Sequence, residues 1–119
     1  MPSSLLTVVE TSAFTRRAET LLSAEEYEDL IYYLARYRDA GDEIPGTGGV
    51  RKLRFAARSK GKSGGVRVIY YFFDQENPLY ALLVFGKNEQ TDMSSEQKKW
   101  ATAFVATIKG AAKSRRRLQ

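Results

Sequence analysis

The segment from Arg51 to Arg67 holds seven basic residues and no acidic one. Two parts of it, residues 50–56 and 66–73, have the period-two spacing of β-strands, and the glycine-rich residues 57–65 join them. Cations on adjacent strands can converge on one sheet face. There arginine binds a phosphate through a planar pair of donors, and lysine binds it as a mobile charge. The spacing therefore predicts a phosphate-binding cradle.

Alternation along the strands decides which of these cations share a face. If Leu53 and Phe55 point to the core together with Arg51, the other two cations of that strand point the opposite way. The next strand contributes one cation to the same face, and a third predicted strand, residues 79–85, ends in a basic residue at the same rim. The side chains expected in the cradle are those of Lys52, Arg54, Arg67, Lys87 and Asn88.

Such a cradle fits RNA as a ligand or as a substrate. RNA carries its own nucleophile, the 2′-hydroxyl, so a protein that cleaves it has to orient the attack, stabilise the phosphorane and move two protons. The chain has no histidine and no cysteine. This excludes imidazole acid–base catalysis, disulfides and thiolate sites, and leaves a lysine crowded by other cations as acid or base. Docking on RNA or on an acidic partner, without catalysis, is the alternative.

The charge distribution agrees with a polyanionic partner. Residues 1–46 carry four Lys/Arg and nine Asp/Glu, whereas residues 47–119 carry fifteen and five. A strongly basic half favours nucleic acid, although it also serves solubility. The acidic residues of that half are Asp74, Glu76, Glu89, Asp92 and Glu96. Because the first two fall in a predicted turn and the last two at a helix N-terminus, no metal site and no cofactor are expected.

The elements that must position the cradle follow from periodicity and capping signals. Strands are predicted over residues 5–9, 50–56, 66–73 and 79–85, and helices over 12–22, from Ser23 to a stop at Gly41, and from Ser94 onward. Residues 41–49 form a loop and residues 74–78 a hairpin turn. The apolar stripe of the last helix comprises Trp100, Ala101, Phe104, Val105 and Ile108. This order predicts an α+β fold with an antiparallel sheet and helices on one side.

At 119 residues the chain is expected to form one domain, residues 1–110, followed by a basic C-terminal tail, residues 111–119. No apolar run is long enough for a membrane span or a signal peptide. A cytoplasmic location without membrane contact is therefore expected.

The run GVRKLRFAARSKGKSGGVRVIYYFF, followed by LYALLVFGKNEQTDMSSEQ, resembles the RelE/ParE superfamily of bacterial toxins, with HigB-type toxins as the nearest likeness. The resemblance covers roughly residues 5–110. It implies a RelE-like fold with an N-terminal strand and two helices, followed by three antiparallel strands and a C-terminal helix. It also implies the toxin of a type II toxin–antitoxin system, a ribosome-dependent endoribonuclease that cleaves mRNA and inhibits translation.

Carried over position by position, the resemblance implies roles for individual residues. Arg67 would contact the scissile phosphate and stabilise the phosphorane, and Lys52 or Lys87 would move protons. The residues expected to bind RNA are Arg54, Arg51, Lys60, Lys62 and Asn88. The implied partners are the ribosome, mRNA and a cognate antitoxin with a helix-turn-helix fold. With Ile69 and Tyr71 on the exposed face beside the cradle, the antitoxin is expected to offer an acidic, partly apolar surface.

Two other interpretations remain open at the level of sequence. The first is a non-catalytic RNA-binding or antitoxin-binding module that keeps the fold, which the missing histidine allows. A DNA-binding corepressor that acts only with its antitoxin is the weaker alternative.

Overall fold

The computed structural model describes residues 4–57 and 65–117, in which five strands form one sheet and three helices cover it. The strands are β1 (Val8–Glu10), β2 (Asp42–Glu43), β3 (Val50–Phe55), β4 (Val66–Tyr71) and β5 (Leu79–Gly86). The helices are α1 (Ser12–Leu21), α2 (Ala24–Arg36) and α3 (Ser95–Arg117). The predicted α+β class is confirmed.

The sheet has the order β1-β5-β4-β3-β2. The central strands β3, β4 and β5 pair antiparallel, as predicted, whereas β1 pairs with β5 in parallel. The two-residue strand β2 was not expected, because its residues lie in the stretch that the glycines marked as a loop. It forms because the chain turns back through residues 44–49 and lays Asp42 and Glu43 beside β3.

Helix α1 begins at Ser12, as its apolar spacing predicts, and α2 begins directly after Ser23, as its capping signal predicts. Thr11 accepts a hydrogen bond from the backbone N–H of Phe14, and Ser23 and Glu26 form a complete capping box. Helix α2 ends at Arg36, before the predicted stop at Gly41. Gly41 is needed for another reason: a Cβ there would lie 2.8 Å from the ring of Tyr70, whose hydroxyl accepts a hydrogen bond from the Gly41 N–H.

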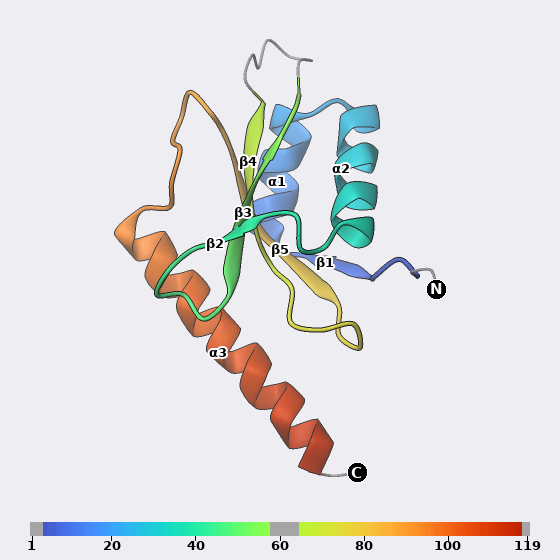
Figure 1. Ribbon diagram of the computed structural model, residues 1–119. Coiled ribbons are helices and arrows are strands. Elements are labelled where there is room, and N and C mark those ends of the chain that lie inside the picture. The colour runs from blue at the N-terminus through green and yellow to red at the C-terminus, as the bar shows by residue number, and fades with distance from the viewer. Residues whose placement is uncertain (1–3, 58–64, 118–119) are drawn as a thin grey trace.

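The prediction that all helices lie on one side of the sheet is wrong. Helices α1 and α2 cover one face, and α3 crosses the other (Figure 1). Along β4 the side chains of Val66, Val68 and Tyr70 join the first core, and Ile69 and Tyr71 join the second. A helix on each face buries the whole of β4, so the sheet is a central layer.

Burial under α3 corrects a second expectation. Ile69 is 0% and Tyr71 is 2% exposed, so they form no apolar surface beside the cradle. Of the predicted α3 stripe, Ala101 and Val105 are buried, while Trp100 remains 41% exposed. Helix α3 also continues to Arg117, so most of the basic tail belongs to it and extends past the sheet (Figure 1). Within the described part of the chain, none of the helices is both long and apolar enough to cross a membrane.

Candidate nucleic-acid interface

The pairing of β3 with β4 brings the predicted cations together. In the antiparallel register Arg54 lies directly opposite Arg67, and Lys52 lies opposite Ile69. Directly opposed residues project from the same face, so all three cations lie on the face that α3 only partly covers. The sequence-based assignment of Lys52, Arg54 and Arg67 to one face is therefore correct.

These cations line a pocket of about 520 Å³ at the β2–β3–β4 side of the sheet, together with Asp42 and Thr91. Arg67 forms the floor, since it is only 5% exposed, while Arg54 is exposed at the rim. Arginine offers planar pairs of donors to a phosphate, so the two guanidinium groups on this face make the pocket a candidate phosphate site.

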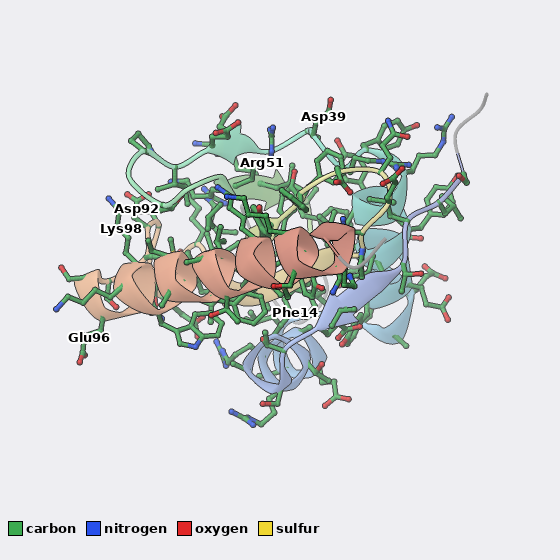
Figure 2. The ribbon with its side chains drawn as sticks, turned by 90° about the horizontal axis from the view of Figure 1, so that it is seen from below. Phe14, Asp39, Arg51, Asp92, Glu96 and Lys98 are labelled. Atoms are coloured by element: carbon green, nitrogen blue, oxygen red, sulfur yellow. The ribbon has the colours of Figure 1, made fainter. Side chains whose placement is uncertain are left out.

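The segment between β5 and α3 folds over the pocket and contacts Lys52. The Lys52 ammonium group donates a hydrogen bond to the Thr91 carbonyl (3.2 Å) and forms an ion pair with Asp92. Asp92 lies near the beginning of α3 (Figure 2), with 75% of its side chain exposed. The sequence had assigned Asp92 to the helix N-terminus, and nothing in the local spacing indicated a contact with a residue 40 positions away.

Arg51 is not part of this pocket, although it was grouped with the RNA-binding residues. It projects from the opposite face of β3, where its guanidinium group donates hydrogen bonds to the carbonyls of Gly41 (2.6 Å) and Asp39 (3.1 Å). It also lies 3.4 Å from a carboxylate oxygen of Glu43 (Figure 2 labels Arg51 and Asp39). These contacts attach the segment after α2 to the sheet.

The remaining residues that were predicted for the cradle or for RNA binding are more peripheral. Lys87 and Asn88 directly follow β5 and are exposed, and neither side chain lines the pocket. The backbone N–H of Lys87 donates to the carbonyl of Gly65 (3.4 Å), which places it beside the start of β4. Gly65 adopts a φ of +78°, and a Cβ there would collide with the carbonyl oxygen of Phe55. Lys60 and Lys62 lie outside the described residues.

The two buried tyrosines of β4 remain protonated near neutral pH. Burial raises the pKa of Tyr70, against the opposing effect of its hydrogen bond from Gly41. Burial, helped by the charge of Asp74, raises the pKa of Tyr71 to about 12. Neither residue lines the pocket, and the Tyr70 hydroxyl instead accepts the hydrogen bond from the Gly41 N–H.

The acidic residues of the basic half are distributed among structural contacts. Asp74 accepts hydrogen bonds from the Glu76 N–H and the Asn77 side chain, which confirms its place in the β4–β5 turn. Glu89 forms an ion pair with Arg17 and accepts a hydrogen bond from the Gly86 N–H. In residues 4–57 and 65–117, no three carboxylate or other metal-binding side chains cluster in a way that would hold a metal ion.

The fold and the family of the chain are known from comparisons. A solved structure of a mutant of the E. coli toxin RelE in the free state, with two arginines replaced by alanine, superposes with a TM-score of 0.56. It covers 86% of this chain and 99% of the other at 15% sequence identity, so it shows the same fold. A family model described as the RelE toxin of the RelE/RelB toxin–antitoxin system matches residues 8–117. The match includes every element of the sheet and all three helices, and the chain therefore belongs to the RelE toxin family.

Proposed function

We propose that this toxin is a ribosome-dependent endoribonuclease that cleaves mRNA and thereby inhibits translation. The observation that carries the proposal is the opposed pair Arg54–Arg67, which shares a pocket with Lys52 in a member of a toxin family. A buried arginine beside an exposed one offers a fixed donor for the reacting phosphate and a second donor for the chain that carries it.

The reaction that suits this pocket uses the nucleophile of RNA itself. The 2′-hydroxyl oxygen attacks the adjacent phosphorus, the bond from phosphorus to the 5′-oxygen breaks, and a 2′,3′-cyclic phosphate and a 5′-hydroxyl result. One proton passes from the 2′-oxygen to a base, either a lysine side chain or a water molecule, and one proton is delivered to the 5′-oxygen. Neither an external nucleophile nor a cofactor has to be supplied, and the protein contributes charge and orientation.

Each cation has a distinct part in this proposal. Arg67 is held by its burial within β4, so it can meet the extra negative charge of the phosphorane without reorganising. Arg54, exposed at the rim, would hold the RNA backbone. Lys52 lines the pocket and is the first candidate for the acid that delivers a proton to the 5′-oxygen. Lys87 is the alternative.

We expect the reaction to depend on the ribosome because the arginines of the pocket lack a group that can accept a proton. Arginine remains protonated in proteins and therefore cannot accept the proton of the 2′-hydroxyl. A scaffold without histidine gains rate mainly by positioning, and a ribosome that bends the mRNA would supply the in-line geometry. We expect the antitoxin partner that family membership implies to be a helix-turn-helix protein, which its own sequence would reveal.

Cleavage is tested by incubating the purified protein with defined mRNA, alone or bound to programmed ribosomes, and mapping new ends by primer extension. We expect cuts on ribosomes and very slow cutting of free RNA. The free-RNA reaction is repeated with EDTA, because rapid EDTA-sensitive cleavage there would indicate a metal nuclease instead. Tight RNA binding with no new ends in either arm would establish the binding-only alternative.

A matched pair of variants assigns the activity to the pocket. Arg54→Ala removes the exposed pocket arginine, and Arg16→Ala removes an exposed arginine from the outer side of α1. We expect only the first to slow cleavage on ribosomes, by about tenfold to a hundredfold. Equal loss in both would mean that general surface charge, and not the pocket, supports the reaction.

A further inference from the structure

A second cavity lies at the edge of the sheet, between α1 and the beginning of α3. This edge cleft has a volume of about 420 Å³, and Leu83 and Phe85 of β5 form part of its wall. It exists because β1 pairs with β5 only at residues 79–81, after which the chain turns into α1. In the part of the chain that the structure describes, residues 83–85 therefore have no neighbouring strand on this side. None of the residues that line the cleft also lines the phosphate-binding cradle.

The edge cleft is close to the cradle on the sheet. Arg54 lies opposite Arg67, and Arg67 in turn lies opposite Phe85, so these three side chains form one row across β3, β4 and β5. Opposed residues of this kind are about 5 Å apart at Cβ. The segment that connects β5 to α3 (Figure 1) borders both cavities, because Thr91 lines the cradle and Gln90 lines the cleft. One ligand can therefore reach both cavities.

Two glutamine amides leave one acceptor and one donor group for a ligand of the cleft. The Gln90 Nε2 donates hydrogen bonds to the Gln97 Oε1 (3.0 Å) and to the Asp92 carbonyl (2.6 Å). The Gln97 Oε1 also accepts a hydrogen bond from the Ser94 N–H (2.9 Å). These partners fix how each amide is turned, because an N–H needs an oxygen and a carbonyl needs an N–H. Within residues 4–57 and 65–117, the Gln90 Oε1 and the Gln97 Nε2 have no hydrogen-bond partner.

The other groups of the cleft favour a flat, neutral ring as the ligand. Phe85 is buried and Leu83 is half-buried, so the wall that β5 provides is apolar. The charged residues of the cleft, Arg17 and Glu89, form an ion pair with each other and leave no excess of positive charge for a phosphate. An apolar wall with a few fixed polar groups is typical of a small-molecule site. A nucleobase fits it, because its faces stack on apolar side chains and its edge carries donors and acceptors.

We propose that the edge cleft binds one base of the RNA whose phosphate the cradle holds, and that Gln90 and Gln97 form hydrogen bonds with the edge of that base. RNA is favoured over a protein segment because each phosphate of RNA has such a ring one sugar away, which matches a cationic cavity beside a neutral one. The inference rests on the proposed function, since the cradle has to hold RNA. It adds a source of sequence preference, which contacts with phosphates alone do not supply.

The test uses Gln97→Glu, which exchanges the donor of the cleft for an acceptor. Glutamate keeps an oxygen for the Ser94 N–H and for the Gln90 Nε2, and it serves in a capping box as well as glutamine does. The cleft of this variant offers two acceptors to the base. Guanine presents two neighbouring donors, N1–H and the N2 amino group, on its Watson–Crick edge. We therefore expect the base preference to move toward guanine.

Binding is measured by fluorescence anisotropy with short strands of abasic phosphates that carry one central 2′-O-methyl nucleotide, A, C, G or U. The probes lack the attacking hydroxyl, so they cannot be cleaved. We expect the unchanged protein to bind its preferred probe at least about fivefold more tightly than a fully abasic strand. In Gln97→Glu the affinity for the guanine probe relative to the other probes should rise by about fivefold or more.

Two further variants separate the cleft from its surroundings. Ala106→Glu adds the same charge at an exposed position of α3 that does not line the cleft, and it should leave the order of the probes unchanged. Ala13→Leu adds bulk to the wall that α1 provides and leaves both glutamines in place. We expect it to bind every probe like the abasic strand, with the affinity for the abasic strand itself unchanged. Thermal unfolding of each variant checks that the fold is retained.

The inference is overturned if the unchanged protein binds abasic and base-containing strands equally, or if folded Gln97→Glu keeps the original order of the probes. It is also overturned if folded Ala13→Leu still discriminates among them. Cleavage on ribosomes at the same sites in Gln97→Glu and in the unchanged protein would overturn it and leave the proposed function in place. Discrimination among the probes without any cleavage on ribosomes would instead contradict the proposed enzymatic activity.

Discussion

The two faces of the sheet differ in the contacts that their arginines make, although the same strands, β3 and β4, supply these arginines. Arg51 projects toward the segment after α2 and donates hydrogen bonds to the backbone carbonyls of Asp39 and Gly41. Arg54 and Arg67 project from the other face, directly opposite each other in the β3–β4 pair, and both line the pocket. The first arginine attaches this segment to the sheet, whereas the other two lie where they can meet an external anion.

This difference arises from how completely helices cover each face. On the α1–α2 face the side chains form a continuous core from Phe14 to Val84. On the other face a single helix packs through Ala101 and Val105 and leaves the region of Lys52 and Arg54 uncovered. Cations next to that uncovered region can meet an external anion.

The largest expected effect is the loss of cleavage in Arg67→Ala. If Arg67 stabilises the phosphorane, its removal slows cleavage on ribosomes by about a hundredfold to a thousandfold. The measurement is single-turnover cleavage of ribosome-bound mRNA. Thermal unfolding checks that the variant remains folded.

Arg67→Lys is the second variant, because it keeps the charge and loses the planar pair of donors. We expect an intermediate rate. A folded Arg67→Ala protein that cleaves at the unchanged rate would exclude Arg67 from the reaction.

On the other face of the sheet, Arg51→Ala should lower the stability of the protein and leave the cleavage rate almost unchanged. It removes two hydrogen bonds from a charged donor to backbone carbonyls, and we expect the free energy of unfolding to fall by about 1–3 kcal/mol. The measurement is urea denaturation, with the cleavage rate determined at a temperature where the variant is folded. We expect a rate within about twofold of the unchanged protein. A large loss of cleavage without a loss of stability would contradict the division between the faces.

Much of this division was predictable from alternation alone. The period-two pattern separates Lys52 from Leu53 on β3 and Arg67 from Val68 on β4, because neighbouring strand residues point to opposite faces. The capping box at Ser94 and Gln97 likewise identified the beginning of α3, and both of its hydrogen bonds are present. These are local rules, and they act within a few residues of the chain.

The features that the sequence did not predict are long-range. Local spacing does not state which face a helix joined by a long connection will cover, so α3 was placed on the wrong side and Tyr71 was taken as exposed. In the same way, the contact of Lys52 with Asp92 depends on the path of residues 87–94 over the sheet. The roles of Lys87 and Asn88 remain predictions.

A smaller effect is expected from Asp92→Asn, which removes the charge that accompanies Lys52 in the free protein. A phosphate would no longer compete with that carboxylate, so we expect RNA affinity to rise by about twofold to fivefold, since exposed ion pairs contribute little. The measurement is fluorescence anisotropy with a short labelled RNA at low salt. Glu96→Gln, an equal change of charge in the first turn of α3, is the control. An equal gain in both variants would reflect net charge alone.

A comparably small effect is expected in the alkaline stability, where each face carries a tyrosine whose pKa lies well above its usual value. Burial raises the pKa of Tyr71 to about 12 beneath α3, and burial together with a hydrogen bond to Glu10 raises that of Tyr27 to about 12 on the other face. In the unfolded chain both hydroxyls ionise near the ordinary tyrosine pKa of 10.0, so the folded state binds more protons above that pH. The stability associated with these groups is therefore complete below about pH 10 and is lost as the pH rises toward about 12.

Tyr71→Phe should reduce this loss in the free energy of unfolding by on the order of 1 kcal/mol. Urea denaturation between pH 9 and pH 11 measures the change. Tyr27→Phe should reduce the loss too but also lower stability at neutral pH, because its hydroxyl donates to Glu10. A decline with pH that neither substitution alters would show that other groups cause it.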